Sequence, residues 1–294
     1  MELSKGKAVT NEARAFVAWN PARGYAAMLA LPVLFLSILF ILPLLTVVYR
    51  AVSQPPGFDS FVAVLSQRAS LKVLLYTFQV AGTVTIACLL IGYPVAFVLS
   101  RTKGTVRNLA IAMVLIPFWT SVVVRTFAWI VLFQRFGIIN NTLVSTGLVK
   151  EPVTFLYNSF GVHIGMVHVL LPFAILPLLS TMQNMDKTLL KAAEVLGANP
   201  LRTFVHVFLP LSMPGVMAAV LLVFISALGF YVTPALLGGP PNMMISVLIE
   251  QYVNRTLNWP AASALASILL VLTVFLYLVF ERASRRFGGL GALN

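Results

Sequence analysis

The sequence has few charged residues for its length. Only 10% of its 294 residues are charged, whereas 60% are hydrophobic. A soluble domain typically carries about a quarter charged residues, so this composition excludes an ordinary soluble domain and indicates a membrane protein. The chain has a single cysteine, Cys88, which excludes a disulfide framework within it.

The sequence also lacks the motifs of common enzymes. It has no G-x-x-x-x-G-K-[ST] phosphate loop, so the chain does not bind ATP by that route. It has neither an HExxH motif nor a nucleophile elbow. His163 and His168 are five residues apart, or about 140° around a helix, unlike metal ligands at i and i+4. We therefore expect neither an enzyme active site nor a bound metal.

Long apolar runs dominate the rest of the chain. A helix needs about 20 apolar residues to cross a bilayer. Six stretches meet this length, at residues 26–49, 73–99, 109–133, 159–181, 215–237 and 261–280. The first is longer than the apolar region of a cleavable signal peptide, and we expect it to be retained. These runs predict an all-α polytopic membrane protein with six transmembrane helices.

The basic residues are unevenly distributed between the predicted loops. They outnumber the acidic residues by 20 to 8, giving a net charge of +12. Most of them lie in the two tails and in the loops after spans two and four, which predicts that these segments and both termini are cytoplasmic. The chain then divides into a tail at 1–25, a transmembrane domain at 26–280 and a tail at 281–294. This interpretation favours contact with membrane lipid over binding of nucleic acid.

The predicted spans are rich in proline, which removes a backbone donor and can kink a helix. Bilayers tolerate this where neighbouring helices or a wet cavity satisfy the freed carbonyls. Ordinary packing of a helix bundle explains any single proline in a span, whereas helices broken along a solute path explain all of these prolines together. The prolines are Pro32, Pro43, Pro94, Pro117, Pro172, Pro177 and Pro234.

The segment KAAEVLGANPLRTFVHVFLPLSMPG (191–215) interrupts the apolar pattern between spans four and five. Apolar residues recur at helical spacing up to Leu196, and Gly197 follows at the C′ position of a helix. Asn199 and Pro200 then supply an N-cap and a first helical residue. The segment therefore predicts two short helices joined at a glycine, within a cytoplasmic loop at 182–214.

The second of these helices has an apolar face formed by Leu201, Phe204, Val205 and Phe208. Pro210 and Pro214 are expected to end it before span five. Two interpretations of this amphipathic loop are open. It lies on the membrane surface, or it fits a groove in a cytoplasmic partner.

The same segment resembles the loop signature of permease subunits of binding-protein-dependent ABC importers, E-A-A-x-x-x-G followed by a helix and a leucine-proline pair. The matching positions are Ala192, Ala193, Gly197, Phe204, Leu209, Pro210, Pro214 and Gly215. The leading glutamate of the signature is replaced by Lys191, and an acid follows only at Glu194. Residues 116–130, 170–178 and 227–240 resemble the spermidine/putrescine branch of these permeases.

This resemblance implies an ABC importer type I permease fold in the bacterial inner membrane, with a cytoplasmic coupling helix between spans four and five. The chain would pair with a second permease subunit in a heterodimer, with an ATPase dimer that holds ATP and Mg²⁺, and with a periplasmic solute-binding protein. It would bind no cofactor itself. The implied ATPase-coupling residues are Lys191, Ala192, Ala193, Glu194, Gly197, Pro200, Arg202, Phe204, His206 and Pro210.

Arg125 is the charged residue that falls within a predicted span. A membrane-embedded arginine costs about 2.5–3.5 kcal/mol on insertion scales. It acts either as an anchor that reaches toward the interface or as part of a gate. Aromatic residues near it either face a solute cation or simply pack. The residues expected along a solute path are Trp119, Arg125, Phe127, Phe230 and Tyr231.

The resemblance implies a small, polyamine-like solute of the spermidine/putrescine class. No acidic residue falls within the predicted spans, so a different solute, such as an amino-acid derivative or an organic anion, is an alternative. An ion-driven secondary transporter is another, although such carriers usually have intramembrane acids and often inverted repeats. A membrane scaffold is a third, and it leaves the pattern of residues 191–215 unexplained.

Overall fold

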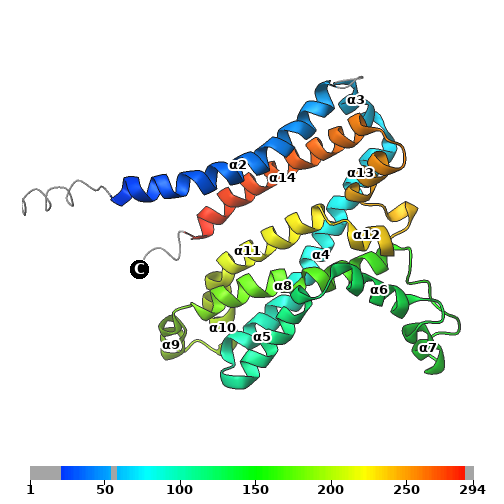
Figure 1. The fold of residues 1–294 in the computed structure, drawn as a ribbon. Helices are drawn as coiled ribbons and strands as arrows, with labels where there is room; N and C mark the ends of the chain where they lie inside the picture. Colours follow the sequence, from blue (N-terminus) through cyan, green and yellow to red (C-terminus); the bar gives the residue numbers. More distant parts are fainter. Residues whose placement is uncertain (1–20, 54–57, 289–294) are drawn as a thin grey trace, which may run out of the picture.

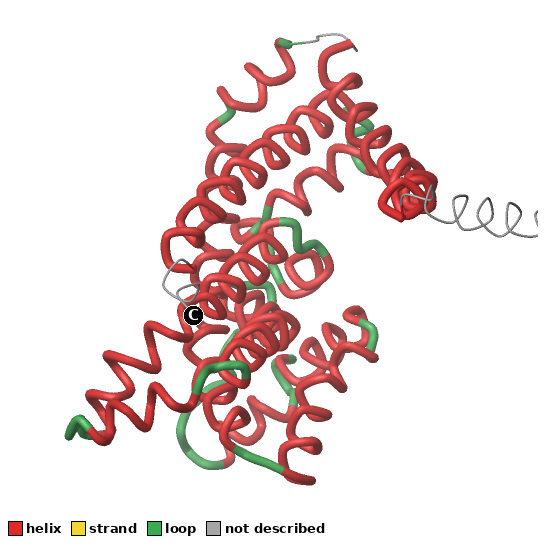
Figure 2. Tube along the Cα trace, turned by 90° about the vertical axis from the view of Figure 1, so that its left-hand side faces the viewer, coloured by secondary structure: helices red, strands yellow, loops and turns green. Residues whose placement is uncertain are grey.

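The computed structural model describes residues 21–53 and 58–288, and within these ranges the chain forms helices and loops without a strand (Figure 1). Short connections join most of the helices (Figure 2). The helices are α2 (Pro21–Ser53), α3 (Asp59–Ser66), α4 (Arg68–Arg101), α5 (Gly104–Trp119), α6 (Val122–Phe133), α7 (Ile138–Ser145), α8 (Ser159–Gln183), α9 (Lys187–Val195), α10 (Pro200–Thr203), η1 (Phe204–Phe208), α11 (Leu209–Leu228), α12 (Val232–Leu237), η2 (Pro240–Asn242), α13 (Ile245–Asn254) and α14 (Trp259–Gly288). Residues 1–20, which hold most of the predicted N-terminal tail, and residues 289–294 lie outside the described residues, whereas residues 281–288 of the predicted C-terminal tail continue α14.

The prediction of six membrane-crossing segments is confirmed for the described part of the chain. Four predicted spans are correct to within a few residues, because α2, α4, α8 and α14 contain them. The segments that are long and apolar enough to cross a membrane are residues 28–53, 68–101, 122–145, 159–183, 200–228 and 259–282. The all-α polytopic fold class is therefore confirmed.

The predicted third span, 109–133, is not one helix. It is divided between α5 and α6, with Thr120 and Ser121 in the break. Pro117 has no N–H to continue the helix. The backbone N–H and the hydroxyl of Thr120 both donate to the Pro117 carbonyl, at 3.3 and 3.0 Å, and this turn ends α5. A turn after Phe133 likewise separates α6 from α7.

The predicted fifth span, 215–237, is wrong at both ends. The helix begins at Pro200, continues through α10, η1 and α11, and ends at Leu228, before Gly229. The expected span residue Pro234 lies instead in the separate short helix α12. The second helix of the 191–215 segment is therefore the beginning of span five.

The expected helix end at Pro210 and Pro214 does not occur because a π-helical turn, η1, precedes these prolines. In η1 the Leu209 N–H donates to the Phe204 carbonyl, five residues earlier. In a regular α-helix the ring of Pro210 would meet the carbonyl four residues earlier and would leave it without a donor. The wider π turn accommodates the proline, so the chain stays helical.

The centre of the fold is formed by α4, α8 and α11, which pack closely against one another. Their buried side chains include Val84, Met166, Leu178 and Val223. Gly215 of α11 permits one close approach, since a Cβ there would lie 2.7 Å from the Thr181 hydroxyl of α8. Small residues at such crossings let membrane helices pack at short distance.

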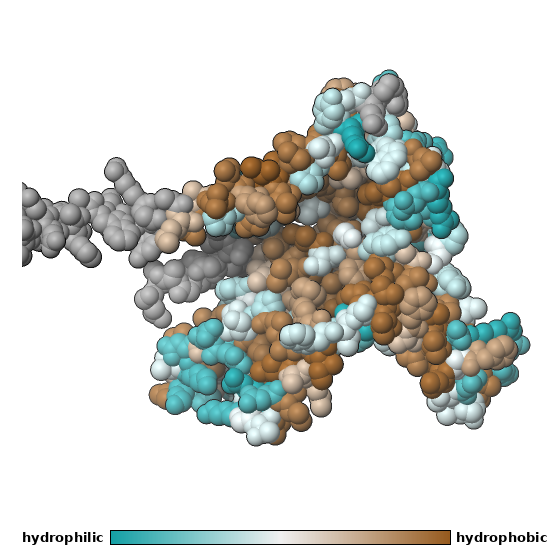
Figure 3. All heavy atoms as spheres, viewed as in Figure 1, coloured by the Kyte–Doolittle hydropathy of each residue, from teal (hydrophilic) through white to brown (hydrophobic). Residues whose placement is uncertain are grey.

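The pair α2 and α14 packs beside this centre (Figure 1). None of the apolar membrane window of α2 is buried within the described structure. Apolar side chains cover the middle of the molecule in Figure 3, and hydrophilic ones gather around α9 and around α3, α13 and α7. This arrangement suits a protein whose middle zone is immersed in lipid.

Candidate functional site

A knob, residues 187–208, projects from one end of the bundle (Figure 1). Its helix α9 ends in a Schellman motif, in which the Gly197 N–H donates to the Glu194 carbonyl and the Ala198 N–H to the Ala193 carbonyl, both at 3.0 Å. Gly197 has a φ of +81°, a left-handed conformation that favours glycine. The predicted C′ position of Gly197 is confirmed.

The two helices of the knob begin at capped residues. Asn199 Oδ1 accepts from the Arg202 N–H at 2.8 Å, and Pro200 occupies the first turn, as predicted. At the start of α9, Asp186 accepts from the hydroxyl and from the N–H of Thr188, at 2.6 and 2.8 Å. These two bonds hold the pKa of the Asp186 carboxyl below its usual value, and the bond from the hydroxyl contributes more than the bond from the N–H.

Large apolar side chains are exposed at the tip of the knob. Val195 and Leu196 are each 87% exposed, and Leu201 is 71% exposed. They flank the Gly197 turn, in a region that Figure 3 shows to be largely hydrophilic. Gathered apolar groups with a polar rim mark a site of interaction with a partner.

The predicted coupling residues are mainly exposed, and Lys191, Glu194, Pro200 and Phe204 among them also line a cavity behind the knob. Ala193 and Phe204 are partly buried. The exposed ones are Lys191, Ala192, Glu194, Gly197, Pro200, Arg202, His206 and Pro210. Their contact with an ATPase stays a prediction.

The predicted apolar face of the second helix is divided by the structure. Phe208 is 3% exposed and Phe204 is half-buried, and both rings meet Phe97 of α4, with centroids 5.0 and 5.7 Å away. The Arg101 guanidinium lies 4.3 Å from the centroid of Phe97. These aromatic side chains therefore attach the knob to α4, and Leu201 and Val205 remain exposed.

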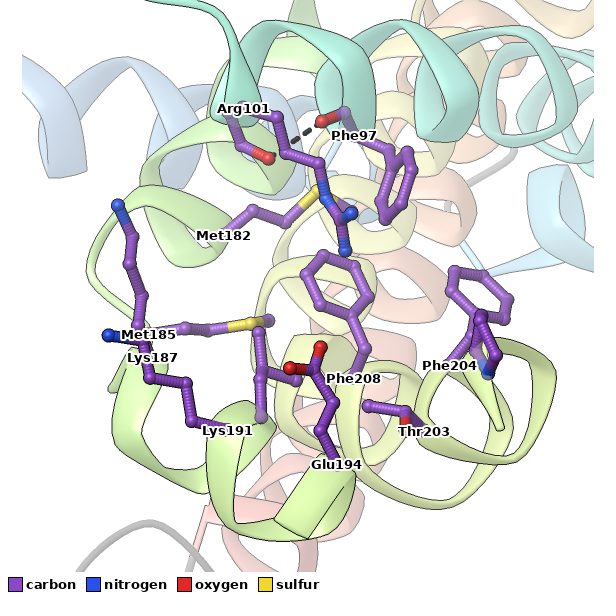
Figure 4. Close-up of a pocket in the computed structure, with 13 residues that line it drawn as sticks. Phe97, Arg101, Met182, Met185, Lys187, Lys191, Glu194, Thr203, Phe204 and Phe208 are labelled. Atoms are coloured by element: carbon purple, nitrogen blue, oxygen red, sulfur yellow. Dashed lines mark hydrogen bonds between the residues drawn. The ribbon is translucent and has the colours of Figure 1, made fainter. Parts of the chain in front are cut away.

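Behind the knob lies a cavity of about 480 Å³ (Figure 4). Met182, Met185 and Phe208 line its apolar part, and Lys191 and Glu194 contribute charged groups from α9. It separates α9 from the end of α4. The sequence analysis missed the contribution of α4, because Phe97 and Arg101 are distant in the chain and belong to no motif of the loop.

A second cavity, of about 310 Å³, lies where the break between α5 and α6 meets α8 and the end of α11. Arg125 lines it, and its Nη2 donates to the Thr120 carbonyl at 3.3 Å. The Arg125 Nε is buried and has no hydrogen-bond partner among the described residues. We call this space the break cavity.

The break cavity brings together two of the five predicted path residues, Arg125 and Phe230. The other three do not line it. Trp119 is 90% exposed, Phe127 is 52% exposed and Tyr231 is 40% exposed, so these rings face the surroundings of the isolated chain.

The sequence analysis missed the other walls of the break cavity. Phe118 belongs to α5, Phe173 to α8 and Ser226 to α11. Pro117, followed by the Thr120-Ser121 pair in mid-span, is the signal that marks the break. No pattern within the separate helices α8 and α11 indicates which of their faces it meets.

The histidines of α8 have separate partners. His163 Nε2 lies 2.7 Å from the Thr83 hydroxyl of α4, and the Trp129 indole of α6 donates to His168 Nδ1 at 3.1 Å. In the described ranges, no three His, Cys, Asp or Glu side chains gather as metal ligands would. The two rings thus join α8 to neighbouring helices on different sides.

Comparison with known proteins assigns a chain of this architecture to a family. The model of the family described as "binding-protein-dependent transport system inner membrane component" matches residues 88–289. The chain belongs to this family. The permease, as we call it from here, is a multi-pass inner-membrane component of a transport system, and the family is one of ABC importer permeases rather than of enzymes.

Individual relatives agree with this membership. The permease is 36% identical to the spermidine/putrescine transport system permease protein PotB of Escherichia coli (strain K12), over 73% of this chain and 78% of that protein. It is 28% identical to the putative 2-aminoethylphosphonate transport system permease protein PhnU of Salmonella typhimurium (strain LT2), over 88% of this chain and 92% of that protein.

A solved structure shows the same fold. A chain of a bacterial alginate ABC transporter, in complex with an alginate pentasaccharide-bound periplasmic protein, matches with a TM-score of 0.78 at 18% identity. The match covers 90% of the permease and 96% of that chain. The predicted ABC importer permease fold is thus confirmed.

Proposed function

We propose that the permease moves a small solute across the inner membrane as one subunit of an ATP-driven importer. A periplasmic binding protein delivers the solute, and a second, different permease subunit completes the path. A separate ATPase dimer binds ATP and Mg²⁺ and hydrolyses the nucleotide. The family membership supports this class of transporter.

The observation that carries the proposal is the shape of the knob. A rigid turn at Gly197 exposes Val195, Leu196 and Leu201 to a partner, and the helix that follows runs without interruption into the membrane as α10, η1 and α11. A movement imposed on the tip is therefore transmitted along one continuous helix to Leu228. Closure of the ATPase dimer would move the knob as a lever and switch the path between two states.

The distribution of basic residues supports the orientation that this mechanism needs. The knob, the beginning of α2 and the end of α14 lie toward the same end of the molecule in Figure 1. The two tails and the loops predicted to be cytoplasmic together hold most of the 20 basic residues. We place the knob and both termini in the cytoplasm, where an ATPase can reach the knob.

The relatives support an amine-bearing solute. Permeases named for spermidine and putrescine are among the most similar proteins, and one named for 2-aminoethylphosphonate matches over more of the chain. All three of these named compounds carry an amino group. We therefore propose a small amine as the transported solute, either one of the polyamine-like class or one that also carries an anionic group.

Purification of the tagged permease from its native membrane tests the proposal. We expect an ATPase, a second permease and a binding protein to co-purify, and solute uptake into vesicles to need ATP inside them. Uptake that follows a proton or sodium gradient without ATP would instead identify an ion-driven secondary transporter. Insertion into the membrane without any uptake would identify a scaffold.

A further inference from the structure

Arg125 carries a charge within the apolar membrane-crossing segment 122–145, just after the break that separates α6 from the apolar helix α5. The combined course of α5 and α6 runs from Gly104 to Phe133, and the break between them falls close to its centre. Within the described residues the Arg125 guanidinium makes a single hydrogen bond, to the neutral Thr120 carbonyl, and its Nε has no partner. Since a guanidinium has five N–H donors, most of its donors are left for another acceptor.

The direction of the Arg125 side chain does not suit a simple anchor. An arginine that snorkels extends its head toward the aqueous interface. Arg125 instead bonds backward, to a carbonyl five residues earlier in the break, and lines the break cavity there. A charge held within an apolar membrane segment is costly, and such residues usually mark the path of a solute or an ion.

The beginning of α6 adds to the positive character of the break cavity. The first N–H groups of a helix have no acceptor within it, and the N-cap Ser121 makes no side-chain bond to them. Val122, the first residue of α6, and Thr120 both line the cavity. Interrupted membrane helices use such ends, together with a nearby cation, to hold anionic groups of solutes.

The remaining walls of the cavity strengthen this attraction. Phe118, Phe173 and Phe230 line the same cavity as Arg125 with aromatic side chains, and Ser226 also lines it with a hydroxyl-bearing side chain. Electrostatic attraction is stronger in such a low-dielectric setting than in water. The volume of about 310 Å³ is at the lower end for sites that hold a small molecule.

We propose that the break cavity binds an anionic group of the transported solute, a carboxylate or a phosphonate, through Arg125. The proposal rests on the role of the chain as an importer permease and deepens it. The solute is then a small amine that also carries an anionic group, and not a polyamine with positive charges alone. A purely cationic solute would be repelled by the like charge of Arg125, whose one hydrogen bond among the described residues goes to the neutral Thr120 carbonyl.

Two compounds of equal backbone length test the charge requirement. 4-Aminobutanoate and putrescine both have an amine at one end, and they differ in having a carboxylate or a second amine at the other. Their binding is measured by calorimetry on the purified permease–ATPase complex in lipid nanodiscs, without the binding protein. 2-Aminoethylphosphonate serves as a third probe, with a phosphonate in place of the carboxylate.

We expect at least one of the two anionic probes to bind more tightly than putrescine, and Arg125→Gln to weaken it by about tenfold to a hundredfold, as for a hydrogen-bonded charge. Arg125→Lys, which keeps the charge but not the planar fork, should give an intermediate loss. Arg135→Gln is the matched control, because Arg135 is exposed beyond the end of α6 and does not line the cavity. It should leave binding unchanged.

The proposal is wrong if putrescine binds as tightly as the anionic probes, if Arg125→Gln leaves their binding unchanged, or if none of the three probes binds. ATP hydrolysis by the same complex, stimulated by the loaded binding protein, is measured in parallel. Stimulated hydrolysis without binding of an anionic probe rejects the anion site and leaves the importer role intact. Absence of any associated ATPase rejects the importer role itself.

Discussion

The knob and the break cavity differ in how they are built. The knob consists of one continuous stretch of chain, and its caps, its Gly197 turn and its exposed tip all lie within residues 186–208. The break cavity draws its walls from α5, α6, α8, α11 and Phe230, which are up to 113 residues apart (from Pro117 to Phe230). A local motif thus forms the surface that we assign to a partner, whereas tertiary packing forms the space that we assign to the solute. Changes in the knob should therefore disturb coupling to the ATPase, and changes in the break cavity should disturb the choice of solute.

The largest expected effect is a loss of stability when the Phe208 ring, which attaches the knob to α4, is removed. Phe208→Ala removes a side chain that is 3% exposed and packs on Phe97, and it should lower the free energy of unfolding by about 3–5 kcal/mol. Phe230→Ala, at the edge of an existing cavity, should cost less than about 2 kcal/mol. Denaturant unfolding in detergent measures both. Equal losses would contradict the difference in packing that separates the two regions.

The next effect concerns the turn of the knob. Gly197 and Gly147 have φ values of +81° and +73°, and a Cβ at either would meet no atom within 4 Å. Valine at either position therefore brings a similar backbone strain, of about 1–2 kcal/mol. Because Gly197 alone of the two lies in the knob, Gly197→Val should reduce ATP-driven uptake by about tenfold while the permease still inserts. Gly147→Val should leave uptake near the wild-type rate, and a similar loss in both variants would show that the strain acts through general stability.

A smaller effect is expected from the charge of the knob. Arg202 is exposed on the side that we assign to the ATPase, and Arg202→Glu should weaken binding of the ATPase by about twofold to fivefold at low salt. The difference should shrink as ionic strength rises, because exposed charges are screened. Arg135→Glu, an equal reversal on an exposed arginine outside the knob, is the control. Uptake and ATPase affinity that stay unchanged in Arg202→Glu would remove Arg202 from the docking surface.

The smallest effect is a pH dependence at the start of α9. The bonds from Thr188 lower the pKa of Asp186 in the folded protein. Its stabilising contribution is therefore complete above the unfolded pKa, about 3.9, and is lost as the pH falls through the lower folded pKa. Amide exchange at Thr188, followed between neutral pH and pH 3, should show this loss, and Asp186→Asn should abolish it. Thr188→Val removes the hydroxyl bond, so it should move the pKa of Asp186 upward, and an unchanged pKa would contradict the assigned cause.

Local patterns in the sequence were enough to predict where several helices begin and end. Asn199, Pro200 and Gly197 act as a cap, a first residue and a C′ residue because each role depends on backbone conformation within a few neighbouring residues. The same locality explains why four of the six spans were predicted to within a few residues. Apolar length is a property of a contiguous segment.

The errors in the predicted helix ends arose at prolines, because the effect of a proline depends on the neighbouring backbone. Pro117 lies near a real break, because Thr120 bonds back to its carbonyl and ends α5. Pro210 was expected to end a helix and does not, because a π turn at η1 spaces the chain around it. Proline removes the same donor in both places, and the neighbouring backbone decides whether the helix ends or adapts.

By itself the sequence determined the membrane class, the number of crossing segments and the position of the knob between spans four and five. Each follows from composition or from contiguous patterns, which need no knowledge of distant contacts. Tertiary structure alone decided that Phe204 and Phe208 turn toward α4, leaving Val195, Leu196 and Leu201 as the exposed tip. It also decided that Arg125 faces a cavity shared with Phe173 and Phe230. The reason is that the rotation of one helix against another depends on how all of their side chains pack, and no single helix contains that information.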